Sequence, residues 1–445
     1  MRALSLVVVI TSSLALAQEG ADAGAPLPLP AGVEAPAASS PDAGVLLAPP
    51  PAPVPGSPSV LQQVLDAFRP YGTIKPTVMP SSAAVESFSQ PNASAITAAG
   101  NPVLANSPDH ARLTFQVAQS RLGLWVNEKG RVRGHVEIDF IDFSKASPTV
   151  ASLPRLRIAA LEWQPLDALT LAAGQDWDLH APLNAHGSNM VGTNFLSGNT
   201  GFMRQQVKVL GKLGDFELGG AVGMEGVNAT AKDAAFELSD VPTFALRVQY
   251  GLGAHGKVGV SGLATSLILG LGTPTERRTF AGAAAVFADL TFAKTNVRFE
   301  ANLGRNESNI GMLGLGFGGA KDLDEWGGFV SIRQGLTEMH ALYAHAGLAR
   351  VLNRSDVKPS YGYATLPADG SPPPMSSAAL TTTGPGMMSN VGVTLGYELR
   401  VHKNLAFLFE GFYFHSEHVL QAVDAARVSG DREAFGGELA GLLTF

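Results

Sequence analysis

The C-terminal stretch, Glu433 to Phe445, alternates regularly between two kinds of side chain. From residue 435 onward, one parity carries only aromatic, leucine and glycine residues: Phe435, Gly437, Leu439, Gly441, Leu443 and Phe445. The other parity includes the carboxylate of Glu438 among small and apolar residues. A period of two is typical of a β-strand, and a strand with an apolar face can lie in hydrocarbon only if its open edge is paired. The sequence therefore predicts that the last strand pairs with the first and closes the sheet.

The N-terminal residues differ in composition from the rest of the chain. A basic residue precedes an apolar run from Leu4 to Ile10, and small residues precede Gln18, so we expect residues 1–17 to be a secretory signal peptide. Residues 18–59 are rich in Pro and Ala and have no periodicity, which predicts an extended, disordered linker. Apolar residues at helical spacing then predict a short periplasmic helix over 60–70. This helix is either a plain surface helix or an oligomerisation segment or lid at the barrel mouth.

Alternating segments recur along the remaining chain. In the clearest of them, 131–140, charged residues and histidine occupy one parity, and apolar residues and glycine occupy the other. We predict about sixteen strands, an even number as bacterial outer-membrane barrels require. Their expected ranges are 74–86, 111–126, 130–142, 154–163, 169–176, 204–212, 216–225, 241–250, 257–269, 277–292, 296–306, 325–334, 337–350, 388–401, 405–416 and 432–445.

Short and long connections alternate between these segments. The short ones are expected at 127–129, 164–168, 213–215, 293–295, 334–336 and 402–404. The long ones are expected at 87–110, 143–153, 177–203, 307–324, 351–387 and 417–431. Short periplasmic turns with long external loops are typical of a transmembrane barrel, whereas a sandwich would not keep this parity. We therefore expect an all-β fold, a transmembrane antiparallel barrel over 71–445 with both termini periplasmic and a water-filled lumen.

Cationic side chains gather on the lumen-facing parity of the second to sixth expected strands. This set, the basic wall, consists of Arg121, Arg131, Arg133, Arg155, Arg157, Arg204 and Lys208. Neighbouring strands lie about 4.8 Å apart, so the charges should form one continuous patch that could guide anionic solutes. The alternative is mutual neutralisation by Glu137, Asp139 and Glu217.

Residues 177–203 form the third of the expected long loops. Loops of this length in a compact fold are often functional, so we expect this loop to fold into the lumen and form its constriction, with a plain external loop as the alternative. The candidate constriction residues are Asp176, Asp178, His180 and His186.

Signals for an enzyme or a metal site are weak. The chain has no Cys, which excludes disulfides, thiolate metal sites and a cysteine nucleophile, and its ten His show no metal-ligand spacing along the sequence. No serine lies in a nucleophile-elbow pattern. We therefore expect no catalytic residues, no enzymatic activity, no metal and no cofactor.

Several short stretches resemble the DcaP-like porins of Gram-negative outer membranes. They are QSRLGLWV at 119–126, GHVEIDF at 134–140, LAAGQDWDLHAPL at 171–183 and VRFEANLG at 297–304. The resemblance implies a trimeric, sixteen-stranded channel that takes up small organic anions such as dicarboxylates. It also implies that Arg121 is a lumen arginine and that Asp176 and Trp177 open the constricting loop. The carboxylate of Asp176 departs from the small or hydroxyl residue usual in that family.

The expected function is an outer-membrane porin for passive diffusion of small hydrophilic solutes, with a preference for organic anions. The expected partners are outer-membrane lipid and lipopolysaccharide, the barrel-assembly machinery, small anionic solutes and two further copies of the chain in a homotrimer, but no nucleic acid. The expected assembly signal is the set Phe435, Leu439, Leu443 and Phe445. Two alternatives stay open: a structural barrel joined to the cell wall through the Pro-rich arm, and an outer-membrane hydrolase.

Overall fold

The computed structural model describes residues 67–82, 85–86, 90–91, 111–141, 154–190, 197–201, 203–224, 241–269, 274, 276–316, 321–358, 386–421 and 427–445. The expected signal peptide, the linker and most of the expected helix lie outside these residues. So do the loop stretches 92–110, 142–153 and 359–385. Within the described residues, no helix combines the length and the hydrophobicity needed to span a membrane.

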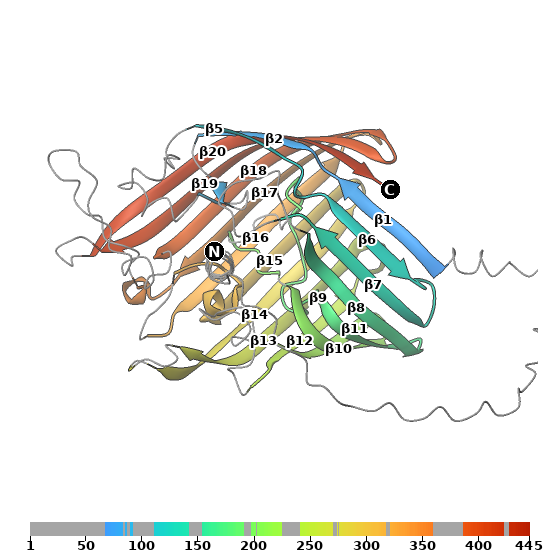
Figure 1. Ribbon diagram of the computed structural model, residues 1–445, viewed down its shortest axis with the longest axis horizontal. Helices are drawn as coiled ribbons and strands as arrows, with labels where there is room; N and C mark the ends of the chain where they lie inside the picture. The colour runs from blue at the N-terminus through green and yellow to red at the C-terminus, as the bar shows by residue number, and fades with distance from the viewer. Residues whose placement is uncertain are drawn as a thin grey trace, which may run out of the picture.

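The described residues form one closed antiparallel β-barrel (Figure 1). Its strands are β1 (Phe68–Ile74), β2 (Thr77–Ser81), β5 (Arg112–Gln116), β6 (Arg121–Val126), β7 (Val132–Asp139), β8 (Arg155–Leu166), β9 (Leu169–Trp177), β10 (Met203–Leu213), β11 (Phe216–Gly223), β12 (Thr243–Gly251), β13 (Gly256–Leu269), β14 (Arg277–Phe292), β15 (Thr295–Arg305), β16 (Asp324–Gly335), β17 (His340–Val351), β18 (Met387–His402), β19 (Leu405–Gln421) and β20 (Arg427–Thr444). Because β1 and β2 are two parts of one strand, as are β5 and β6, the barrel has 16 strands, as expected from the alternation. A separate pair, β3 (Val85–Glu86) and β4 (Gln90–Pro91), adds a small second sheet.

The barrel closes where its first strand meets its last. Thr73 and Ile74 of β1 pair with Thr444 and Leu443 of β20, and β2 pairs with β20 at Thr77. Gly72 and Phe445 exchange two backbone hydrogen bonds of 3.1 Å. We call this junction of β1 and β2 with β20 the closing seam. The predicted pairing of the last strand with the first is therefore confirmed.

The two faces of the wall differ in polarity, and the apolar face is outward. Large exposed side chains point out of the barrel along successive strands: Phe115, Leu161, Trp163, Val207, Leu246, Phe280, Leu303, Leu395 and Phe435. Charged and amide side chains of the same strands are buried inside: Glu137, Asp139, Arg157, Arg204, Lys208, Glu300, Asn302, Asn390 and Glu438. This distribution is the reverse of a soluble sandwich and is typical of a transmembrane barrel with a polar lumen.

Two expected boundaries were wrong. The first strand begins at Phe68, so residues 68–70 of the expected helix belong to β1 instead. Pro70 is tolerated there because β20 reaches β1 only from Thr73 onward, which leaves the edge beside the proline unpaired.

The expected long loop at 417–431 is mostly strand. Cross-strand pairing of β19 with β20 continues from Glu417 opposite Asp431 to Gln421 opposite Arg427. The polar composition of this stretch favoured a loop in the sequence analysis, but the backbone pairs as a strand.

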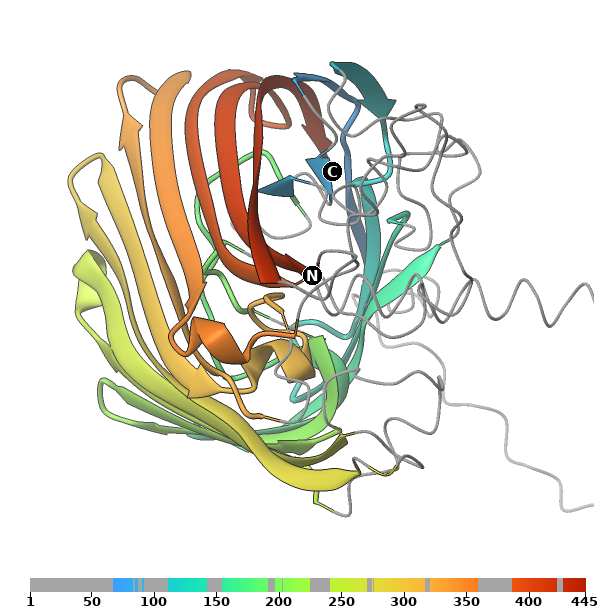
Figure 2. The same ribbon diagram turned by 90° about the vertical axis from the view of Figure 1, so that its left-hand side faces the viewer.

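The described residues of the 177–203 loop lie inside the barrel, as predicted (Figure 2). It leaves the wall at the end of β9 and crosses the interior, where its backbone contacts side chains of β13, β15, β16 and β19. A short 3-10 turn at Glu307–Ile310 also turns inward, and its Ile310 packs with Leu179 of the loop in one apolar cluster. The lumen is thereby narrowed by segments that the wall itself holds.

The closing seam generates a first prediction. A Cβ atom at Gly72 would lie 2.5 Å from the Phe445 ring and 2.8 Å from the Arg121 carbonyl oxygen. Gly72→Ala should therefore lower the free energy of unfolding by about 1–3 kcal/mol, since overpacking forces neighbours to shift. Gly211→Ala is the matched control, because no atom lies within 4 Å of its added Cβ. Urea unfolding followed by gel mobility measures both, and equal midpoints for the two variants would show that the seam is not tightly packed at Phe445.

Candidate functional site

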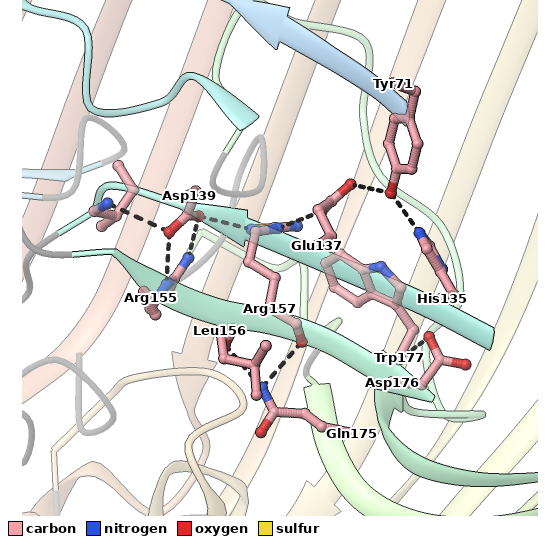
Figure 3. A network of polar contacts seen from close by, with 11 residues as sticks. Tyr71, His135, Glu137, Asp139, Arg155, Leu156, Arg157, Gln175, Asp176 and Trp177 are labelled. Carbon is pink, nitrogen blue, oxygen red and sulfur yellow. Dashed lines mark hydrogen bonds and ion pairs between the residues drawn. The ribbon is translucent and has the colours of Figure 1, made fainter. Parts of the chain in front are cut away.

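Carboxylates of β7 contact arginines of β8 on the inner wall: Asp139 lies directly opposite Arg155, and Arg157 falls where the register shifts. Arg155 binds Asp139 through two hydrogen bonds of 2.9 and 2.6 Å. Arg157 bridges both acids, with 2.7 Å from its Nε to Glu137 and 3.1 Å from its Nη1 to Asp139 (Figure 3). The pairing register of β7 with β8, which shifts by a bulge at Glu137, creates this arrangement.

Other strands enclose the same network. The Tyr71 hydroxyl, from β1, donates to Glu137 at 3.0 Å and also contacts His135. The Trp177 ring lies 5.7 Å from the Arg157 guanidinium, a distance suited to a cation–π contact. The side-chain amide of Gln175 donates to the carbonyls of Leu156 and Arg157, where β9 has separated from β8 (Figure 3). Arg157 is thus completely buried even though it belongs to the lumen wall.

The two members of the basic wall on β10 are also paired. Arg204 binds Asp178, and Lys208 binds Asp176. Asp178 belongs to the 177–203 loop, so its ion pair attaches the loop to the wall, whereas Asp176 lies on β9 and joins two neighbouring strands just before the loop begins. Asp176, the residue that departs from the resembling family, neutralises Lys208.

Three members of the basic wall remain, and their positions differ. Arg133 pairs with Glu162 on β8 at 2.5 Å. Arg131 is outside the lumen: it precedes β7 in the turn, and its exposed guanidinium binds Asp167 and the carbonyls of Gln164 and Pro165. Its placement in the basic wall was therefore wrong, because the chain bends away from the strand at this residue.

Arg121 differs from the others. It lies on β6 opposite Asp139, but it forms no salt bridge with any described residue, and its Nε is buried without a hydrogen bond. Around it, Arg155 and Arg157 share Glu137 and Asp139. Among the described residues, these three guanidiniums and two carboxylates carry one excess positive charge. Glu217, one of the three acids of the alternative interpretation in which the wall is neutralised, pairs with Arg247 on β12.

Polar groups of the wall hold the 177–203 loop along its path. The Ala181 amide donates to Ser261 on β13 at 3.2 Å, and the Leu183 amide donates to Glu300 on β15 at 3.1 Å. The His186 amide donates to Ser331 on β16 at 2.8 Å. In return, Arg298 on β15 donates to the Asn184 carbonyl at 3.0 Å. The backbone groups of these four loop residues therefore find hydrogen-bond partners on the lumen wall, as buried backbone groups require.

The far end of the loop reaches the closing seam. Lys75, fully buried between β1 and β2, donates to Glu438 of β20 and to Gln119, each at 2.7 Å, and lies 3.5 Å from the Ser188 hydroxyl. Gln119 also accepts from the Met190 amide at 2.9 Å. These contacts, which we call the loop anchor, join the loop to the first, second and last strands.

A second carboxylate completes the loop anchor. Glu410 of β19 lies directly opposite Glu438 and accepts from the Ser188 amide and, at 2.7 Å, from the Tyr343 hydroxyl. The sequence contained one signal for this site: the Lys75-Pro76 pair interrupts the first strand, and the interruption at 117–120 lies opposite.

The two histidines of the loop add no charge. Burial lowers the pKa of His180 and of His186 to about 4, so both imidazoles are neutral at pH 7. His186 Nδ1 lies 2.8 Å from the Ser331 hydroxyl. The expected constriction residues therefore divide into two paired acids and two neutral imidazoles.

A small cavity of about 230 Å³ lies between the root of the loop and the wall. Apolar atoms of Trp177, Leu179 and Pro182 line one side, and Lys208 and Arg247 line the other. Among the described residues, the group with metal-ligand spacing lies outside the lumen, on β19 and β20. The lumen site is therefore suited to contact passing solutes through charges and hydrogen bonds.

Solved structures with the same fold are outer-membrane proteins. The outer membrane channel DcaP of Acinetobacter baumannii is 13% identical, with a TM-score of 0.58 over 85% of this chain and 97% of that one. The anion-selective porin from Comamonas acidovorans is 11% identical, with a TM-score of 0.54 over 85% and 99%. OprB of Pseudomonas putida is 10% identical, with a TM-score of 0.51 over 86% and 96%.

No protein-family model and no curated protein matches this sequence. At the identities of the solved structures, the likeness concerns the fold. This chain has the sixteen-stranded barrel fold of the outer-membrane porins, DcaP included.

The buried ion-pair network generates a second prediction. Arg157→Ala would leave Glu137 and Asp139 buried with one cation fewer, which should lower the free energy of unfolding by about 3–5 kcal/mol. The matched control is Arg69→Ala, which removes an exposed pair with Glu128 and should cost about 1 kcal/mol or less. Urea unfolding of the detergent-folded barrels compares them, and a similar loss in both would contradict the buried network.

The loop anchor generates a third prediction. Lys75→Met combined with Glu438→Gln removes both charges of a buried pair together, so the barrel should still fold, while the loop loses its Lys75 contact. We expect larger fluctuations of the open-channel current in planar bilayers, because the end of the loop is less restrained. Lys294→Met, at an exposed turn, is the control and should leave the current as in the wild type. Unchanged current noise in the double variant would count against the anchor.

Proposed function

We propose that this protein is an outer-membrane porin of a Gram-negative bacterium that passes small hydrophilic solutes by diffusion and prefers small organic anions. The observation that carries the proposal is a closed barrel with an apolar exterior, a polar interior and a loop held across the lumen. A purely structural barrel has no need of a charged lumen wall or of an internal loop attached by ion pairs. The porin folds of DcaP and of the Comamonas protein support the same reading.

The anion preference rests on Arg121 rather than on the number of arginines. The pairs Arg133–Glu162, Arg204–Asp178 and Lys208–Asp176 each sum to zero. The excess positive charge arises where Arg121 joins the network of Glu137 and Asp139. In the low-dielectric surroundings of a narrow lumen, a single excess charge attracts anions over several ångströms.

We also propose how the barrel sits in the outer membrane and how it assembles. The outward Phe435 and Phe445, which are 63% and 54% exposed, suit contact with lipid and with the barrel-assembly machinery, and Leu439 and Leu443 share their face. The termini are assigned to the periplasm because the short turns lie at their end of the barrel. We assign a homotrimer from the sequence resemblance alone.

The experiment that tests this function is a reversal-potential measurement in a salt gradient across a planar bilayer. The wild type should conduct and favour chloride, and the preference should weaken as ionic strength rises. Arg121→Ala should abolish the preference, moving the reversal potential to zero or toward cation selectivity, because it removes the one excess charge.

Arg131→Ala is the matched control, since this arginine is already paired with Asp167 outside the lumen. It should leave selectivity unchanged. Equal shifts for the two variants would show that total charge matters rather than the lumen position. Absence of conductance in the folded wild type would favour a structural barrel instead.

A further inference from the structure

Four ligand-type side chains gather on the outer face of the last hairpin, away from the lumen. His415 and Glu417 share one face of β19, and Asp431 and Glu433 share the facing positions of β20. In the strand register, His415 lies opposite Glu433, and Glu417 lies opposite Asp431. The result is a two-by-two arrangement of one imidazole and three carboxylates.

The distances within this group suit a metal ion. One ligand atom each of His415, Glu417 and Asp431 lie within 4.8 Å of one another, and Glu433 Oε1 lies 3.5 Å from His415 Nδ1. Ligand atoms around a tetrahedral zinc ion lie about 3.4 Å apart, given metal–ligand distances near 2.1 Å. Small rotations of the half-buried His415 and Glu417 side chains and of the exposed Asp431 side chain would bring the three atoms to that separation.

The local hydrogen bonds leave ligand atoms for such an ion. His415 Nδ1 is excluded from solvent and makes no hydrogen bond. Arg354 and Ser389 both donate to Oε2 of Glu417, at 2.7 and 2.5 Å, and so hold this carboxylate in place. Tyr413 holds Glu433 in the same way, through Oε1 at 3.0 Å. Three carboxylates face the two arginines Arg354 and Arg350, so one negative charge is left over in this group.

The position of the group is at the edge of the membrane belt. The next pair along the hairpin is Tyr413 opposite Phe435, and both rings are exposed on the outer face. Aromatic rings in such a position mark the interface between hydrocarbon and head groups. The group therefore lies just beyond the apolar belt, at the rim that carries the long loops, where ions in water can reach it.

We propose that His415, Glu417, Asp431 and Glu433 form a binding site for a divalent transition-metal ion such as Zn²⁺. The imidazole ligand favours zinc, copper or nickel over magnesium or calcium, which prefer oxygen ligands only. Because the ligands come from both strands, the ion joins β19 to β20 beyond the membrane belt. Its binding stabilises the folded barrel, since the unfolded chain does not hold the four groups together.

The test uses the full mature chain, folded in detergent and stripped of metal with a chelator. Titration with zinc chloride in a calorimeter should show one Zn²⁺ per chain. Removing a residue that only hydrogen-bonds to a metal ligand typically weakens metal binding by roughly 10- to 100-fold. His415→Ala removes a ligand itself, so it should weaken zinc binding by more than that. Asp431→Asn should also weaken it. His402→Ala, which changes an exposed histidine at the opposite rim, should bind zinc as the wild type does.

Copper provides a measurement that needs no variant. The electron paramagnetic resonance spectrum of one equivalent of Cu²⁺ bound to the wild type should show hyperfine coupling to a single imidazole nitrogen. Undiminished zinc affinity in His415→Ala would overturn the proposal. Displacement of zinc by an equal concentration of Ca²⁺ would overturn it too, because the carboxylates alone would then be the site.

Discussion

The structure depends on one constraint: in hydrocarbon, every backbone amide and carbonyl must find a partner within the protein. A sheet meets this constraint only when its last strand pairs with its first, which makes the closing seam the critical junction. The seam is interrupted at Lys75 and Pro76, yet its backbone groups are satisfied. Lys75 donates its amide to the Ser120 hydroxyl, and the Pro76 carbonyl accepts from Gly441. At this interruption the charged side chain of Lys75 turns inward, and the barrel nevertheless stays closed.

Buried groups in the wall lack water as a partner, and this also explains why the charges of the wall are paired. A buried guanidinium without an acid would lose several kcal/mol of solvation, so the arginines of β8 and β10 lie beside acids from β7 and from the loop. A lumen wall rich in cations is then almost neutral. Under the function proposed above, the charge that is left after pairing sets the ion selectivity, and in this wall that charge belongs to Arg121.

The loop and the seam depend on each other. The loop anchor needs Lys75 from the first strand, Glu438 from the last and Gln119 from the second, and these groups meet only after the barrel has closed. The loop can therefore reach its final position only late in folding. Wall side chains form hydrogen bonds with the loop backbone. In return, the loop gives these polar side chains partners that water would otherwise have to provide.

The sequence alone determined the elements whose signal is local. Alternation with a period of two predicted sixteen strands that each have one apolar face, because side-chain direction in a strand follows directly from position. The alternation of short and long connections assigned that face to the exterior, and the length of the 177–203 loop predicted that it lies inside. These patterns failed where neighbours override local preference: residues 68–70 pair with β6 as strand, and 417–431 continue as a hairpin. Turn residues such as Pro70 looked like breaks, since the sequence does not show which strand edge is left unpaired.

Only the tertiary structure decided which side chains meet. Glu137 lies beside Arg157, and Arg131 lies outside the lumen, because of strand register and a bulge that no spacing along the chain reveals. The group around His415 shows the same limit: its members are far apart in sequence and became neighbours through hairpin register. Local periodicity specifies which face a residue occupies, but contact across strands depends on register, which is a property of the closed barrel as a whole.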